Sequence, residues 1–198
     1  MLNKLNEFLK NDGIQSITEG HIGECPEYVI ALFNLVNNST NIVDAIEIGM
    51  NSGHSAVSML SGSWQLNLVS FDLGSHNYVL SAKRFIDTYF PGRHTLIIGN
   101  SMTTINNYAN ITDRKYDLIF IDGGHDKNCC YSDLVNCKRL AHSSTLIILD
   151  DYVEESVGRH NIGPKTSWDK LVSMKFIEQI KVVYFGNNRG FVCGNYVF

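Results

Sequence analysis

The sequence lacks long apolar runs, regularly spaced cysteines and any surplus of basic residues. No apolar stretch approaches the roughly 20 residues of a membrane-spanning helix, and the N-terminus lacks the apolar core of a signal peptide. The five cysteines are odd in number and form no Cys-x-x-Cys pair, which argues against a disulfide framework and a structural zinc site. We therefore expect an intracellular, reduced protein in the cytoplasm, with no membrane association.

The charge balance argues against non-specific binding of nucleic acid. The chain has 16 Lys and Arg against 20 Asp and Glu, a net charge of −4. Binding to a phosphate backbone needs clustered Lys and Arg, although a local basic patch stays open. A small molecule is therefore a better candidate partner than nucleic acid.

The chain has no linker, internal repeat or low-complexity segment, so we expect one domain over residues 1–198. Residues 1–38 are predicted to form two helices, the first with Leu2, Leu5 and Leu9 on one face. The second has an apolar face of Val29, Phe33 and Val36. Residues 39–198 are predicted to form an α/β core.

Five apolar runs in this core indicate strands covered on both faces, as in a parallel sheet. They are Ile42–Ile48, Leu66–Phe71, Thr95–Ile98, Tyr116–Ile121 and Thr145–Leu149. Between them lie helical stripes, one of Tyr78, Ala82, Phe85 and Tyr89 and one running from Cys130 to Ala141. The alternation predicts a doubly wound, mostly parallel sheet. The tail, Lys181–Phe185 and Phe191–Cys193 around the turn at 186–190, is predicted to form an antiparallel hairpin.

Sheets of this kind bind ligands beyond the carboxyl ends of their strands. The first run ends in Glu47-Ile-Gly49-Met-Asn-Ser-Gly53-His-Ser55. The two glycines allow a sharp turn and a close approach to a ligand, and Ser55 can satisfy free amides at a helix start. Glu47 needs a partner in this apolar setting, which is either a ligand group or a nearby Lys or Arg.

The next two runs also end in polar residues. Asp72 follows Glu47 by 25 residues, at the place where an acidic residue accepts hydrogen bonds from ribose hydroxyls. Capping of the next helix is the alternative role for Asp72. Ser101, after the third run, either borders a nucleoside base or caps a helix.

The fourth and fifth runs end in Asp122 and in Asp150-Asp151. If the two strands are neighbours, these carboxylates meet and need a proton or a cation between them. Oxygen ligands of this kind suit Mg²⁺, with Ca²⁺ or Mn²⁺ as alternatives. Loop capping and solvent exposure are the plain alternatives for the three residues.

His125 follows Asp122 by three residues and suits the role of a general base near neutral pH. His54 has a weaker case, because it can simply point from the first helix turn. Residues 152–166 lack periodicity and form either a substrate lid, with Arg159 and His160 in contact, or a surface connection.

Together these segments resemble the class I S-adenosylmethionine-dependent methyltransferases. The segment Glu47–Ser55 is similar to their first motif, in the version of the catechol and macrocin-type sugar O-methyltransferases. Asp72, Gly99-Asn100-Ser101, Asp122-Gly-Gly-His125 and Asp150-Asp151 follow in the family's order, so the resemblance covers roughly residues 20–152. It implies a seven-stranded sheet with an antiparallel end.

The resemblance also implies roles for these residues. Glu47 and Gly49 would contact the methionine end of S-adenosylmethionine, Asp72 its ribose, and Ser101 its adenine. The remaining cofactor-binding residues implied are Asn51, Gly53, Ser55 and Asp122. Asp122, Asp150 and Asp151 match the metal positions of the metal-dependent branches, where the ion lowers the pKa of the acceptor oxygen.

The sequence departs from the family pattern at three positions. Asn51 stands where many members have glycine, His125 where the catechol enzymes have a catalytic lysine, and Asp151 where they have asparagine. A lysine base is therefore in doubt, and His125, with Asp122, is the candidate catalytic group.

The leading hypothesis is an enzyme that transfers a methyl group to a hydroxyl of a sugar or phenol. The alternatives are a cofactor-binding scaffold without turnover and a methyltransferase of RNA or protein. The sequence leaves a homodimer open.

Overall fold

The computed structural model describes residues 1–153, 162–185 and 189–198. Its centre is a seven-stranded sheet of order β3-β2-β1-β4-β5-β7-β6. The strands are β1 Asp44–Ile48, β2 Asn67–Asp72, β3 His94–Ile98, β4 Tyr116–Ile121, β5 Ala141–Asp150, β6 Ile177–Phe185 and β7 Arg189–Tyr196. Strands β1 to β5 run parallel, while β7 lies antiparallel between β5 and β6.

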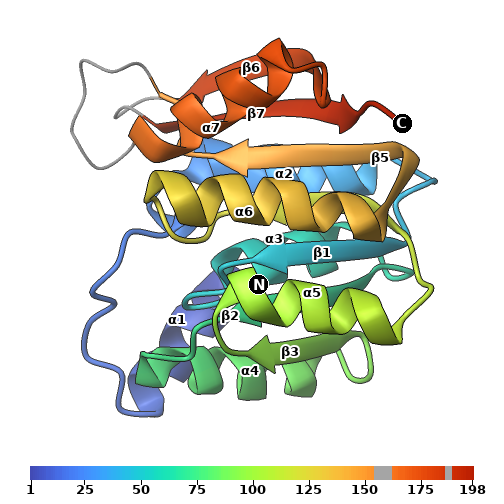
Figure 1. Cartoon of the computed structure of the whole chain (residues 1–198). Helices are drawn as coiled ribbons and strands as arrows, with labels where there is room; N and C mark the ends of the chain where they lie inside the picture. Colours follow the sequence, from blue (N-terminus) through green and yellow to red (C-terminus); the bar gives the residue numbers. More distant parts are fainter. Residues whose placement is uncertain (154–161, 186–188) are drawn as a thin grey trace.

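Within the described residues, seven α-helices flank the sheet (Figure 1). Their bounds are α1 Leu2–Asn11, α2 Pro26–Asn37, α3 His54–Gly62, α4 Asn77–Tyr89, α5 Ser101–Ile111, α6 Lys127–Cys137 and α7 Ile162–Ser173. Side chains of α1 to α4 form one buried cluster against the sheet, and those of α5 to α7 form a second on the other face. Because both faces are covered, the central strands are apolar on both sides.

The strand order reverses between β1 and β4, the two strands at the middle of the sheet. The chain builds outward from β1 to β3, then returns to place β4 on the other side of β1. In open α/β sheets such a reversal is the place where ligands bind, at the carboxyl ends of the strands. The glycine turn and Asp122 both lie at this point.

The expected fold class is confirmed, and so is the antiparallel end of the sheet. The two N-terminal helices are α1 and α2, and the expected buried face of α2 is confirmed only at Val36. Tyr28, Leu32 and Val36 are buried, while Val29 and Phe33 are only partly covered. This helix is apolar on nearly every side, so its pattern did not distinguish two stripes one residue apart.

Several predicted boundaries also need correction. Helix α6 ends at Cys137, and Ala141 opens β5 instead of closing the helical stripe. The strands of the hairpin are longer than predicted, and residues 186–188 of its turn lie outside the described residues. In the described part of the chain no helix is both long and apolar enough to cross a membrane.

Candidate active site

The turn after β1 is shaped by its contact with the loop after β4. Gly49 has a φ of 88°, and its amide donates to the carbonyl of Phe71 at 2.7 Å. A Cβ built at Gly49 would lie 1.9 Å from the carbonyl oxygen of Asp122. Gly49 is therefore required by the neighbouring strand, where the sequence suggested close approach to a ligand.

Asp72 ends β2 and faces this turn. Its carboxylate accepts hydrogen bonds from the amides of Asn51 and Gly74, both at 2.8 Å. It does not cap α4, whose N-cap is His76. Three exposed apolar side chains follow the ends of β2 and β3: Leu73 comes directly after Asp72, Ile98 ends β3 and pairs with Asp72, and Met102 is in the first turn of α5. An acidic residue at the end of the second strand, followed by exposed apolar side chains, is the arrangement that suits a ribose with an attached base.

Glu47 is fully buried and has two hydroxyl partners. Its carboxylate accepts from Ser55 and, at 2.6 Å, from Ser70, whose oxygen lies 2.9 Å from Nε2 of His94. Burial raises the pKa of Glu47 to about 7. The alternative pairing of Glu47 with Lys or Arg is wrong, because its partners are these hydroxyl groups. Helix capping by Ser55 is also wrong: α3 has Gly53 as its N-cap and no side-chain cap, and the hydroxyl of Ser55 donates to Glu47. Direct contact between Glu47 and a cofactor stays a prediction.

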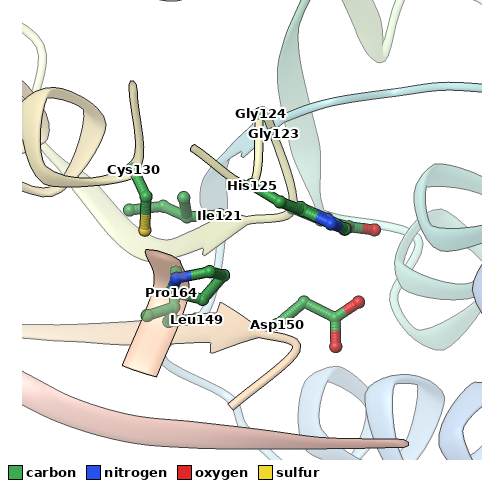
Figure 2. Close-up of a pocket in the computed structure, with 9 residues that line it drawn as sticks. Ile121, Gly123, Gly124, His125, Cys130, Leu149, Asp150 and Pro164 are labelled. Carbon is green, nitrogen blue, oxygen red and sulfur yellow. The ribbon is translucent and has the colours of Figure 1, made fainter. Parts of the chain in front are cut away.

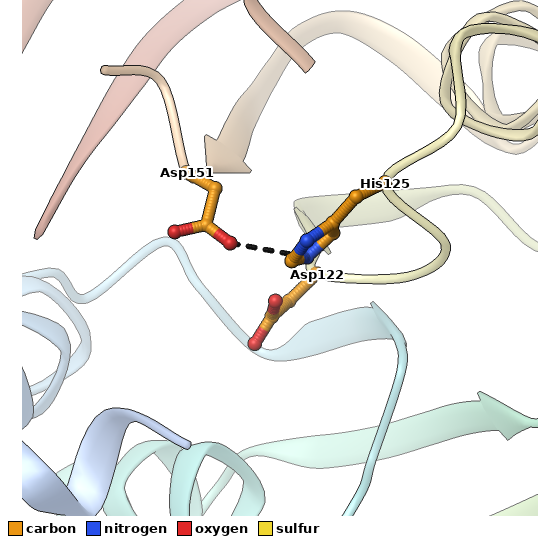
Figure 3. A group of neighbouring side chains, drawn as sticks. All are labelled: Asp122, His125 and Asp151. Carbon is orange, nitrogen blue, oxygen red and sulfur yellow. Dashed lines mark ion pairs between the residues drawn. The ribbon is translucent and has the colours of Figure 1, made fainter. Parts of the chain in front are cut away.

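Three of the predicted residues converge at the ends of β4 and β5 (Figure 3). Asp122, His125 and Asp151 each offer one ligand atom, and these atoms lie within 4.8 Å of one another. Nε2 of His125 lies 3.0 Å from a carboxylate oxygen of Asp151. Asp151 has a φ of 54°, a backbone conformation uncommon for a residue with a side chain. The group can hold a divalent cation or bind a hydroxyl.

Asp150 lies next to this group but is engaged elsewhere. It is buried and accepts a hydrogen bond from the hydroxyl of Tyr28 on α2. Burial and the charge of Asp151 raise the pKa of Asp150 to about 7, and burial and both neighbouring carboxylates raise the pKa of Asp122 well above its usual value. A small pocket at this point has His125 and Asp150 on one side and Cys130 and Pro164 on the other (Figure 2).

The structure also places the remaining candidates. Ser101 begins α5, but Asn100 is its N-cap and accepts from the amide of Met102. His54 is buried between Ser52 and Asn6, and burial lowers its pKa to about 3, so it is not exposed to a substrate. Arg159 and His160 of the predicted lid lie outside the described residues.

The segment before α2 is tied to the turn after β1 and to the start of α3. Asn51, with a φ of 51°, donates from its side chain to the carbonyl of Gly20 at 3.0 Å. The ring of His21 stacks on that of His54 with centroids 3.9 Å apart. No pattern in the sequence predicted these contacts. For Tyr28 the only signal was its spacing of four residues from Leu32, and of Leu32 from Val36, which indicates one face of a helix.

Asp133 on α6 is a buried carboxyl group with an incomplete set of partners. Its side chain is fully buried, and its Oδ1 has no hydrogen-bond partner among the described residues. Burial raises the pKa of Asp133 to about 6, well above the usual range of an aspartate. The folded state therefore favours the neutral form.

This shift predicts a pH-dependent gain in stability for Asp133→Asn. Because the pKa of Asp133 is raised in the folded state, its neutral form supports the fold fully below pH 4. This contribution to the free energy of unfolding is lost as the pH rises through about 6 and the group ionises. The variant should match the wild type near pH 4 and exceed its unfolding free energy by up to about 3 kcal/mol at pH 8. Urea unfolding at both pH values measures this; an equal difference at both would contradict it.

A mostly parallel seven-stranded sheet, a glycine turn at its switch point and an acidic residue ending β2 define a Rossmann-like methyltransferase fold. A sequence model described as a methyltransferase domain matches residues 46–152. This match covers more than half of the chain, which therefore belongs to that family. No curated protein matches the sequence significantly.

Known structures agree with this assignment. An O-methyltransferase from Bacillus cereus, in complex with SAH, is 18% identical with a TM-score of 0.80, over 98% of this chain and 91% of that one. The O-methyltransferase TomG from Streptomyces achromogenes, in complex with SAM, is 13% identical with a TM-score of 0.75, over 100% and 89%. An SAH-bound methyltransferase from Podospora anserina is 14% identical with a TM-score of 0.73, over 98% and 88%. At these identities the likeness confirms the fold.

Proposed function

We propose that this protein, as one methyltransferase domain over residues 1–198, transfers a methyl group from S-adenosylmethionine to a hydroxyl of a small molecule, such as a sugar or phenol. The observation that supports it most is that two sets of polar side chains lie at the carboxyl ends of the parallel strands. Asp72 lies at the end of β2, and Asp122, His125 and Asp151 lie at the ends of β4 and β5. Strand β1, with its glycine turn, lies between them.

This placement suits a cofactor that lies across the end of β1. Its ribose hydroxyls would donate to Asp72, and its adenine would rest on the apolar side chains Leu73, Ile98 and Met102. Its sulfonium end would then point towards Asp122. We place Glu47, Gly49, Asn51, Gly53 and Ser55 along the methionine part, with Ser101 beside the adenine.

The acceptor hydroxyl would lie against the group at β4 and β5. His125 is the most accessible member, with 40% of its side chain exposed against 17% for Asp151. Its imidazole nitrogen either removes the proton of the acceptor or binds a cation. Holding the acceptor oxygen in line with the methyl group accounts for much of the rate of such a transfer.

The donor set of two carboxylates and one imidazole fits a divalent cation. Asp122 and Asp151 would hold it, and the third ligand is either Asp150, as the family resemblance implies, or His125. When bound, the ion supplies a Lewis acid that lowers the pKa of a hydroxyl.

The experiment that tests this function has two parts. Isothermal titration with SAH measures cofactor binding, and release of SAH from S-adenosylmethionine in the presence of catechols, phenols and sugars measures transfer. Absence of SAH binding would overturn the proposal. Binding without transfer to any acceptor would favour a scaffold role, and transfer to RNA or protein would redirect it to a macromolecular substrate.

Asp72→Ala should weaken SAH binding by about 30- to 100-fold, because it removes two hydrogen bonds to a charged acceptor. Asp117→Ala is a matched control. Asp117 lies at the start of β4 and accepts from the amides of Val43 and Asp44, both at 2.9 Å. Both variants lose two backbone hydrogen bonds, so both should lose stability. Only Asp72→Ala should lose SAH affinity, and equal losses in titrations of the two would refute the role of Asp72.

A further inference from the structure

We infer that Tyr28 is a positioning residue for the divalent cation of the proposed site, with Asp150 as one of the ligands of the ion. The hydroxyl of Tyr28 fixes one oxygen of the Asp150 carboxylate, so that the carboxylate keeps the orientation in which it can bind the ion together with Asp122. The inference rests on the proposed function, because it concerns the same site. It follows from the contacts that Tyr28 makes through its hydroxyl and through its ring.

Asp150 contacts two groups through its side chain. It forms a hydrogen bond with the side chain of Asp122, and its Oδ1 accepts a hydrogen bond from the hydroxyl of Tyr28. Tyr28 engages only this one oxygen, and a carboxylate can bind an ion through a single oxygen. Carboxylates that bind metals are commonly held in place by a hydrogen bond from a second residue. Tyr28 is such a residue for Asp150.

The ring of Tyr28 is fixed by packing against the antiparallel end of the sheet. Tyr28 is fully buried on α2, and its ring stacks on Phe185 of β6 with centroids 4.8 Å apart. The ring is also tilted by 42° against Phe191 of β7, at 5.4 Å. Phe191 is the residue that pairs with Asp150 between β7 and β5. The strand next to Asp150 therefore also holds the ring of Tyr28, and close packing leaves the hydroxyl little freedom to move.

A tyrosine suits this role because its hydroxyl is a neutral donor. A phenol with a pKa of about 10 stays protonated near neutral pH and donates one hydrogen bond. Lys or Arg in the same place would also hold Asp150, but its positive charge would repel the cation. Tyr28 therefore orients the carboxylate and leaves the negative charge of Asp150 available to the ion.

Isothermal titration of the full chain with MnCl₂ tests this role. Tyr28→Phe keeps the ring and its packing but removes the hydroxyl, so it should weaken Mn²⁺ binding by about 10- to 100-fold. Asp150→Asn removes the charge of the ligand itself and should weaken Mn²⁺ binding at least as much. The SAH affinity of Tyr28→Phe, measured in excess chelator, should stay within about threefold of the wild type.

Tyr196→Phe is the matched control. Tyr196 is also buried, and its hydroxyl donates to the carbonyl of Leu134 at 2.6 Å. It belongs to the buried cluster on the other face of the sheet from Tyr28. Both variants remove one buried hydroxyl and should lower the melting temperature, but only Tyr28→Phe should lose Mn²⁺ affinity.

Three results would overturn the role of Tyr28. They are Mn²⁺ binding by Tyr28→Phe or Asp150→Asn within about threefold of the wild type, an equal loss of Mn²⁺ affinity in Tyr196→Phe, and absence of Mn²⁺ binding by the wild type. SAH titration of the wild type separates these results from failure of the proposed function. If SAH binds, any of the three results removes only the role of Tyr28, whereas absence of SAH binding overturns the proposed function itself.

Discussion

Replacing Asp122 by asparagine is expected to lower the rate of methyl transfer by about a thousandfold while the protein stays folded. Asp122 is the residue common to the proposed cofactor end, the cation ligands and the acceptor position. Asparagine has nearly the same shape, so the contact between the Asp122 carbonyl and Gly49 is kept. The change removes the negative charge that would hold the cation and face the positively charged sulfonium end of the cofactor.

The thermal stability of Asp122→Asn should show that the loss of activity does not come from unfolding. Burial, Asp150 and Asp151 raise the pKa of Asp122, so the charged form destabilises the folded state as the pH rises. Asparagine removes that charge, and the melting temperature at pH 8 should therefore equal or exceed that of the wild type.

The measurements are SAH release with the best acceptor of the panel and a thermal melt. Asp117→Asn, at the other end of β4, should keep full activity. Activity of Asp122→Asn within tenfold of the wild type would refute the role.

The strands of this fold were readable from the sequence because both faces of the sheet are covered. Strand β4 has the predicted bounds, Tyr116–Ile121, since its apolar run is bounded by polar residues at both ends. Strand β5 begins four residues earlier than the run Thr145–Leu149, at Ala141. Ala141 follows directly on a helical turn and is succeeded by three polar residues, so no local signal separates the two elements. The parallel order came from the alternation of runs and stripes together with the family resemblance.

The candidate site was predictable only in part, because strand ends can be read locally and side-chain partners cannot. Asp72, Asp122 and Asp151 were found because each carboxylate ends an apolar run. Tyr28 was missed because it meets Asp150 across 122 positions of sequence. Nothing in the local sequence marks a helical tyrosine as the partner of one particular carboxylate. The same holds for Ser70, whose contact with Glu47 depends on the register of two neighbouring strands.

Gly49→Ala is expected to destabilise the fold by more than about 3 kcal/mol and to abolish SAH binding. The new Cβ would lie 1.9 Å from the carbonyl oxygen of Asp122 and 2.7 Å from its carbonyl carbon. Both atoms belong to the backbone, so no side chain can move aside. The ends of β1 and β4 must separate, which displaces the turn before Asn51 and the carboxylate of Asp122 together. For a chain of this size the melting temperature should fall by at least about 6–12 °C.

Gly92→Ala isolates the part of this cost that comes from the backbone conformation. Gly92 has a φ of 74°, close to the 88° of Gly49, but a Cβ built there meets no atom within 4 Å. A left-handed conformation alone costs an alanine about 1–2 kcal/mol. Gly92→Ala should therefore lose that amount and keep full SAH affinity, since it lies in the turn before β3. Thermal melts and SAH titrations of the two variants give the difference, which is the steric cost of placing a Cβ between the ends of β1 and β4. If the two variants lose the same stability, Gly49 is needed for its conformation alone, and the close approach to Asp122 does not set the geometry of the site.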